Sequence, residues 1–81
     1  MKVRIVWFQS VQALLQELSP NEQELIFEKL DFLERFPRMY PVKRRGRFPR
    51  HRWFLAGNWL VFYRVVENTV YVRGLWPARI P

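Results

Sequence analysis

The sequence has no cysteine and only one histidine, His51, among its 81 residues. Without cysteine there is no disulfide and no thiolate metal site, and a single histidine is too few for a structural zinc site of the usual kind. The three glycines form no phosphate-binding loop, and the chain shows no Ser/His/Asp set or carboxylate pair. We therefore expect a protein that uses neither a metal nor a cofactor.

Long apolar runs are also missing. The longest run, Trp59–Tyr63, is far too short to cross a bilayer, and the start of the chain turns polar too soon for a signal peptide. A chain of this length is expected to be one domain, residues 1–81, and its 49% hydrophobic and 17% aromatic content indicates a folded one. We expect a soluble cytoplasmic protein with no membrane partner.

Acidic residues are nearly absent from the second half of the chain. Residues 37–81 hold ten lysines and arginines against Glu67 alone, a net charge of +9, whereas residues 1–36 carry a net charge of −2. A charge that served only solubility would not be separated in this way. The asymmetry predicts a surface for a polyanion, either a nucleic acid or an acidic protein.

The most strongly marked secondary structure is a β-hairpin at His51–Val65. Its predicted strands, Arg52–Ala56 and Trp59–Val65, are rich in the aromatic and branched residues that pack well on a pleated surface. The Gly57-Asn58 pair between them suits the positive φ angles of a two-residue turn. The hairpin is therefore the feature around which the rest of the fold is predicted.

Two helices are predicted between an N-terminal strand, Val3–Phe8, and the loop before the hairpin. The first, Val11–Leu18, has Ser10 as a candidate N-cap. The second starts at Ser19-Pro20-Asn21-Glu22, which combines a capping serine, a proline at the first helical position and a glutamate three residues after the cap. It is expected to run to about Phe36, just before a proline.

A final strand at Thr69–Leu75 follows the hairpin after a turn at Glu67-Asn68. The predicted order is therefore β-α-α-β-β-β, with an irregular loop at Arg38–Pro49. Two helices joined by a tight turn need a surface to cover, and the strands supply one. The predicted fold class is α+β: a helical hairpin packed on a mainly antiparallel four-stranded sheet.

Side-chain alternation separates the two faces of this sheet. The helices are expected to cover the face that carries Phe54, Val61, Tyr63, Val65, Val70 and Val72. The opposite face would carry Arg64, Tyr71, Arg73 and Leu75, with His51 at its rim. It would also carry an apolar patch, made of Trp53, Leu55, Leu60 and Phe62, that needs a cover. The loop or the tail can supply that cover, but we favour a partner protein.

The basic segment, Lys43–Arg52 (KRRGRFPRHR), holds one lysine, five arginines and the histidine in ten positions. Guanidinium groups fork onto phosphate or carboxylate, so the segment is predicted to bind rather than to react. The candidate nucleic-acid-binding residues are Lys43, Arg44, Arg45, Arg47, Arg50 and Arg52, with Tyr71 stacking on a base. An acidic segment of a partner protein fits the same charges equally well.

The stretch Gly57–Arg79, GNWLVFYRVVENTVYVRGLWPAR, resembles the RelE/ParE superfamily of bacterial toxins. The positions that match are Gly57, Trp59, Val61, Phe62, Tyr63, Arg64 and Val65 in one strand, and Thr69, Val70, Val72 and Ala78-Arg79 in the next. The resemblance implies the toxin of a type II toxin–antitoxin module, bound to a cognate acidic antitoxin in a hetero-oligomer. Many RelE-like members cleave messenger RNA at the ribosome, whereas ParE-like members poison DNA gyrase.

RNA cleavage through the 2′-hydroxyl needs a base and cations that stabilise the charge developing on the phosphate. Histidine is the side chain best suited to act as that base near neutral pH, so His51 is the candidate. The candidate catalytic residues are therefore His51, Arg64, Arg73 and Arg79.

Three functions stay open at this point. The nucleases of the family place lysine or arginine at outward positions that here are His51, Trp53, Leu55 and Leu60. Cleavage of messenger RNA at the ribosome is the favoured function. The alternatives are a gyrase-directed toxin and a member without activity that only binds its antitoxin or nucleic acid.

Overall fold

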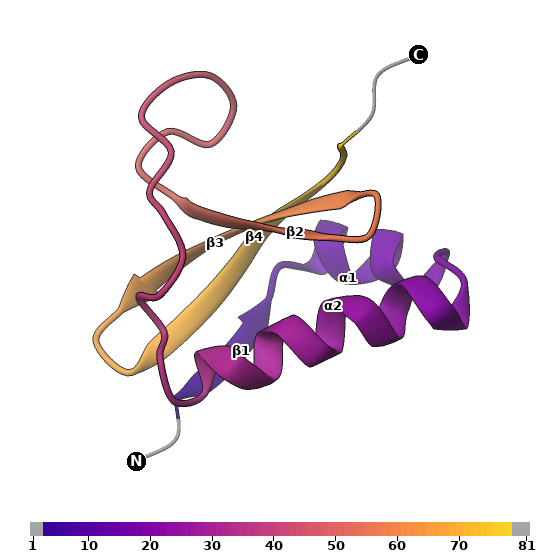
Figure 1. Ribbon diagram of the computed structural model, residues 1–81, viewed down its shortest axis with the longest axis horizontal. Helices are drawn as coiled ribbons and strands as arrows, with labels where there is room; N and C mark the ends of the chain where they lie inside the picture. The colour runs from indigo at the N-terminus through magenta and orange to yellow at the C-terminus, as the bar shows by residue number, and fades with distance from the viewer. Residues whose placement is uncertain (1–2, 79–81) are drawn as a thin grey trace.

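The computed structural model describes residues 3–78, which form two helices and a four-stranded sheet (Figure 1). In chain order the elements are β1 (Arg4–Trp7), α1 (Gln9–Gln16), α2 (Pro20–Leu33), β2 (Arg52–Ala56), β3 (Trp59–Val66) and β4 (Thr69–Pro77). This is the order β-α-α-β-β-β, so the predicted α+β fold class is confirmed.

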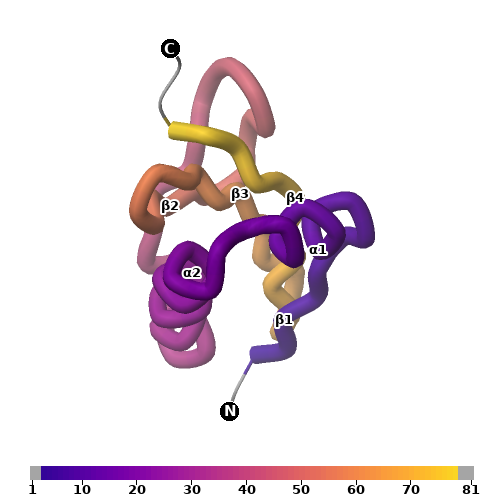
Figure 2. Tube along the Cα trace, turned by 90° about the vertical axis from the view of Figure 1, so that its right-hand side faces the viewer, coloured from indigo at the N-terminus to yellow at the C-terminus, as the bar shows by residue number. Residues whose placement is uncertain are grey.

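The sheet is mixed rather than purely antiparallel. Its strands lie in the order β1-β4-β3-β2, with β1 parallel to β4 and the other neighbours antiparallel. The chain between β1 and β4, which holds both helices, β2 and β3, makes the long connection that a parallel pair requires. Both helices contribute to one core on the same face of the sheet, as the side view shows (Figure 2).

α2 begins at the predicted capping box. The Ser19 hydroxyl accepts a hydrogen bond from the Glu22 backbone N–H (3.2 Å), and the Ser19 N–H donates to Glu22 Oε1 (3.0 Å). Glu22 Oε2 also accepts from the Trp59 indole N–H at 2.7 Å, which ties the start of the helix to β3. The bond from Trp59, followed by those from Ser19, holds the pKa of Glu22 below its ordinary value.

The start of α1 differs from the prediction. The helix begins at Gln9 with Phe8 as its N-cap and no side-chain capping bond, so the predicted Ser10 cap is wrong. The chain enters this helix directly from β1, and the Phe8 N–H donates to the Val72 carbonyl oxygen at 3.2 Å. The pairing of β1 with β4 therefore sets the start of the helix.

The end of α2 also differs from the prediction. The helix ends at Leu33, and the Phe36 ring, expected near the helix end, is 60% exposed. Pro37 has no backbone N–H to donate to the carbonyl oxygen of Leu33, so the helical hydrogen bonding stops at that residue.

The core lies between the helices and one face of the sheet. Its most deeply buried side chains come from both layers: Val11, Leu15, Ile26, Leu30 and Leu33 from the helices, and Phe54, Val61, Tyr63, Val70 and Val72 from the strands. Val65 packs against this cluster while partly exposed. The predicted inward face of the sheet is therefore confirmed.

A β-bulge in β4 changes the face of the residues that follow it. Phe62 pairs with Gly74 while Tyr63 pairs with Val72, so Arg73 has no partner position on β3. The extra residue resets the alternation of the strand. Leu75, which was predicted on the outer face, is instead buried opposite Val61.

Tyr63 fastens the sheet to the segment that follows α2. Its side chain is fully buried, and its hydroxyl donates to the Pro37 carbonyl oxygen at 2.9 Å. Burial disfavours the phenolate and raises the pKa of Tyr63 to about 12. The unfolded chain therefore loses this proton at a lower pH than the folded protein does.

We expect the free energy of unfolding to fall as the pH rises from about 10 to about 12, because the unfolded tyrosine ionises first in that window. Below pH 10 both states keep the proton, so the contribution is constant there. Tyr63→Phe should remove this part of the alkaline loss, and at neutral pH it should cost about 1 kcal/mol for the missing hydrogen bond. Urea unfolding at neutral pH and across the window measures both effects. A variant as sensitive to alkali as the native protein would contradict the assignment to Tyr63.

Candidate nucleic-acid interface

The basic segment forms a loop whose two ends are pinned together. The Lys43 N–H donates to the His51 carbonyl oxygen (2.7 Å), and the Arg50 N–H donates to the Lys43 carbonyl oxygen (2.8 Å). Val42 and Arg52 form an isolated antiparallel bridge just below these bonds. The residues between the pinned ends rise away from the sheet beside β2 (Figure 1).

This loop holds strained backbone. Phe48 (φ 57°) and Arg50 (φ 67°) lie in the left-handed region, where a residue with a side chain costs on the order of 1–3 kcal/mol. Gly46 adopts a similar angle (φ 80°) without that cost. Contacts elsewhere must offset the strain, and Phe48 supplies one.

The Phe48 ring covers part of the outer face of the sheet. It stacks on Phe62 with ring centroids 4.8 Å apart and an interplanar angle of 24°. It also lies so close to Gly74 that a Cβ atom there would collide with the ring. Phe62 is only 2% exposed as a result. The loop therefore covers this part of the patch, so the expectation that a partner covers Phe62 is wrong for the free chain.

The rest of the predicted patch stays open in part. Leu55 is 49% exposed, and Trp53 and Leu60 are partly exposed. These three side chains share the outer face because Leu55 pairs with Leu60 and Trp53 pairs with Phe62. They form an apolar strip beside the loop.

His51 is buried rather than placed at the rim of an open face. The side chain is 9% exposed, and its ring centroid lies 5.7 Å from that of Phe48 in an edge contact. Nδ1 lies 3.0 Å from the Pro49 carbonyl oxygen, whereas Nε2 is buried without a hydrogen-bond partner. The Phe48 ring covers His51, so the predicted position at the rim of an open face is wrong.

The loop presents most of its cations to solvent. Arg44, Arg45 and Arg50 are exposed, and the Arg47 guanidinium lies over the Trp76 ring at 3.8 Å from its centroid. Lys43 Nζ lies 6.0 Å from the centroid of Phe62. The positive charge therefore lies beside the outer face of the sheet.

Arg52 is an exception among the predicted phosphate ligands. Its Nη1 donates to the carbonyl oxygens of Tyr40 (2.7 Å) and Arg38 (3.1 Å). The side chain is partly buried and holds the segment after α2 against β2. Its role here is structural, because the guanidinium satisfies backbone carbonyls rather than facing solvent.

Two of the candidate catalytic arginines, Arg64 and Arg73, lie on the neighbouring strands β3 and β4. Arg64 is exposed on the outer face and pairs across the strands with Tyr71, which is partly exposed. The Arg73 guanidinium, displaced by the bulge, lies over the Phe8 ring at 4.3 Å from its centroid. The prediction for Arg79 lies outside the described residues. Arg64 and Tyr71 are thus the predicted pair that the structure brings together.

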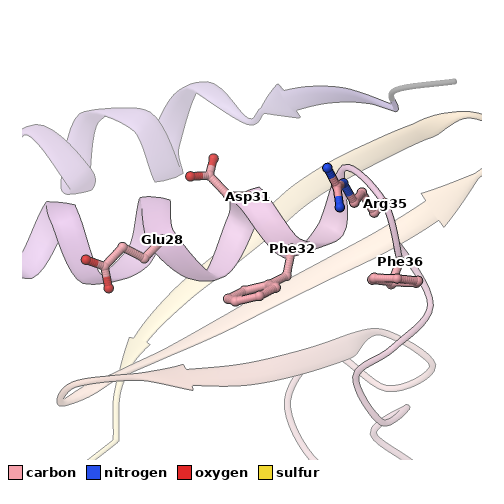
Figure 3. Close-up of a pocket in the computed structure, with 5 residues that line it drawn as sticks. All are labelled: Glu28, Asp31, Phe32, Arg35 and Phe36. Atoms are coloured by element: carbon pink, nitrogen blue, oxygen red, sulfur yellow. The ribbon is translucent and has the colours of Figure 1, made fainter.

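Sequence reasoning missed a groove on α2, on the side of the molecule away from the sheet's outer face. It has a volume of about 580 Å³ and is lined by Glu28, Asp31, Phe32, Arg35 and Phe36. The close-up shows the Phe32 and Phe36 rings following one another at the end of the helix (Figure 3). The spacing of three and four residues in this set was the signal that could have found it.

Among the described residues there is neither a cluster of metal-binding side chains nor a membrane-spanning helix. Residues 3–78 contain no group of three histidine, cysteine, aspartate or glutamate side chains placed to hold a metal ion. Within the same range, neither helix has the length and apolar character needed to cross a membrane.

The comparisons with known proteins give matches among solved structures. No family model matches the sequence, and no curated protein matches it. Among solved structures, the toxin RelE of E. coli, as a double arginine-to-alanine mutant in the free state, superposes with a TM-score of 0.78. The match covers 96% of this chain and 85% of that one at 21% identity. The chain has the RelE fold. The RelE fold thus accounts for nearly the whole molecule, including the strands that carry Arg64 and Tyr71.

Proposed function

We propose that the chain is the toxin of a type II toxin–antitoxin module and that it inhibits translation by cleaving messenger RNA at the ribosome. The observation that carries the proposal is the RelE fold over 96% of the chain, because the matched structure is that of a toxin. A ribosomal target places the protein in the cytoplasm.

The outer face supplies groups suited to RNA. Arg44, Arg45 and Arg50 are exposed on the loop and can bind phosphates, as can Arg64 on β3. Tyr71, opposite Arg64, offers a ring on which an unpaired base can stack. A guanidinium at the scissile phosphate stabilises the charge that develops during attack by the 2′-hydroxyl. The role of His51 as the base requires that the loop open, because the ring is enclosed when it is closed.

The cognate antitoxin is proposed to be acidic and to form a hetero-oligomer with the toxin. The exposed arginines of the loop attract carboxylates, and the apolar strip of Trp53, Leu55 and Leu60 gives an adjacent surface that a partner can bury. An antitoxin bound in this way would cover the surface assigned to RNA, so binding would neutralise the toxin.

A gyrase-directed toxin is the second candidate. The observation that favours it is the apolar strip itself, because Trp53, Leu55 and Leu60 occupy outward positions where an RNA-cleaving surface benefits from cations. The burial of His51 also favours this function, because an enclosed ring is poorly placed to act as a base on RNA. This function predicts contact with a protein rather than with RNA.

Controlled expression in bacteria, with and without the neighbouring antitoxin gene, separates these functions. We expect growth to stop without the antitoxin, and incorporation of labelled methionine to fall before incorporation of labelled thymidine. Co-expression of the antitoxin should restore growth. A fall in DNA synthesis first, with a DNA-damage response, would favour the gyrase-directed toxin, and harmless expression would contradict both.

A further inference from the structure

Phe48 occupies an unusual position for a residue of an arginine-rich loop. Its ring lies flat on Phe62, at 4.8 Å between centroids and 24° between planes, on the face of the sheet opposite the helices. Gly74 provides the space for the ring, because any side chain there would collide with it. The backbone of Gly74 has no positive φ, so the close approach of Phe48 is the reason for glycine that the structure offers.

A small cavity adjoins the ring. It has a volume of about 200 Å³ and lies between the loop, β4 and α1. Phe48 lines it from the loop, Arg73, Gly74, Leu75 and Trp76 line it from β4, and Ser10, Val11 and Leu14 line it from α1. If Phe48 moved away, this cavity would join the space above Phe62 and Gly74. The resulting recess would have a flat aromatic floor and a glycine that admits a planar group.

Cations surround this recess. Lys43 Nζ lies 6.0 Å from the Phe62 centroid, Arg73 lines the cavity, and Arg47 lies over Trp76. A flat aromatic surface among positive charges is the arrangement that binds a nucleotide of a single strand, through base stacking and phosphate contacts. An aromatic side chain of a protein partner would use the floor but would leave these cations unmatched.

The loop that holds Phe48 in place is strained. Phe48 and Arg50 both have positive φ angles, although neither is glycine. Beneath the closed loop, the buried Nε2 of His51 has no hydrogen-bond partner. Opening the loop would release the strain and let water or a hydroxyl group reach that nitrogen. The closed state therefore carries two energetic costs, the strained backbone and the unpaired Nε2.

We propose that residues 43–50 form a lid, and that the Phe48 ring is a built-in occupant of a nucleobase site whose floor is Phe62 and Gly74. A base of single-stranded RNA displaces the ring, stacks on Phe62 and thereby exposes His51. The lid follows from the contacts of Phe48, the strained backbone of the loop and the enclosed His51, whereas the choice of RNA as the ligand rests on the proposed function. Free toxin is thus held in a closed, self-occupied state.

Two substitutions open the lid by different routes. Phe48→Ala removes the ring, and Gly74→Ala keeps the ring but places a methyl group where it lies. Reaction of the single histidine with diethyl pyrocarbonate, followed by mass spectrometry, reports whether the lid is open. If the open state is about 1–10% populated in the native protein, each variant should raise the rate about 10–100-fold. The double variant should match Phe48→Ala alone, because the methyl group acts only through the ring.

Binding of a fluorescent RNA tetranucleotide to the same folded variants tests the ligand. Phe48→Ala should tighten binding by the same factor as it raises the His51 rate, because the apparent affinity scales with the open fraction. Phe36→Ala, which removes an exposed phenylalanine from the end of α2, is the matched control and should change neither quantity.

The outcomes separate the lid from its ligand and from the proposed function. Unchanged His51 reactivity in both single variants would overturn the lid. An open lid without tighter RNA binding, or with tighter binding only of the antitoxin, would overturn the nucleobase site. If the RNA result holds while expression causes no growth arrest, the site stands and the proposed toxin function fails.

Discussion

Replacing Arg44, Arg45 and Arg50 together by glutamine should lower the affinity for single-stranded RNA by about 100-fold at about 0.1 M salt. These three side chains are exposed on the loop, so their loss should leave the core intact. Each phosphate contact with a single strand contributes about 0.7 to the slope of log affinity against log salt concentration. Three lost contacts therefore reduce the slope by about 2, which corresponds to the stated loss at that salt concentration.

The matched control replaces Lys29, Arg35 and Arg38 by glutamine. All three are exposed on or just after α2, away from the loop, and the change removes the same charge from the native net charge of +7. We expect this variant to keep most of its affinity and its salt slope. Equal losses in the two variants would mean that RNA responds to net charge alone, and a flat salt response of the native protein would exclude phosphate binding by the loop.

Arg64→Gln should lower the rate of RNA cleavage by about 10²–10³-fold, because a preorganised cation at the reacting phosphate contributes on that scale. Arg64 is exposed in the middle of β3, opposite Tyr71, so its substitution should not disturb the core. Cleavage of messenger RNA in single turnovers measures the rate. Thermal unfolding of the same sample shows whether the variant is folded.

Arg35→Gln is the control for this variant, because it removes another exposed arginine, from beyond the end of α2. It should cleave at the native rate. If Arg64→Gln also cleaves at the native rate, Arg64 does not contact the reacting phosphate. If it loses binding without losing rate at saturation, Arg64 serves as a binding residue only.

The sequence predicted the order of the elements and the inward face of the sheet because both depend on local signals. Ser19, Pro20 and Glu22 mark the start of α2 by capping chemistry that the chain carries within four positions. The inward residues of β3 follow from strict alternation next to a well-marked turn. Signals of this kind act within a few residues, so they can be read from the sequence without knowledge of the rest of the fold.

The errors arose where a long-range contact overrides the local pattern. The bulge at Arg73 moves Leu75 to the inner face, and its only local mark is the glycine that follows. Phe48 closes over Phe62 from a loop that has no periodicity, so its path was not predictable. His51 is buried as a consequence, and Arg52 is recruited by carbonyl oxygens twelve and fourteen residues earlier in the chain.

These corrections change the interpretation of the candidate site. The candidate base and the candidate phosphate ligands were expected on one open face. Arg64 and Tyr71 are there, but His51 lies under the Phe48 ring. The proposed cleavage with His51 as the base therefore requires a movement of the loop.

The most direct measurement of the central claim is the fate of messenger RNA on translating ribosomes exposed to the purified protein. Primer extension across the message should show new 5′ ends within the codon at the ribosomal A site, and no cleavage of the same RNA without ribosomes. Adding the antitoxin should abolish these ends. Intact messenger RNA on ribosomes, together with inhibition of supercoiling by purified gyrase, would contradict the account.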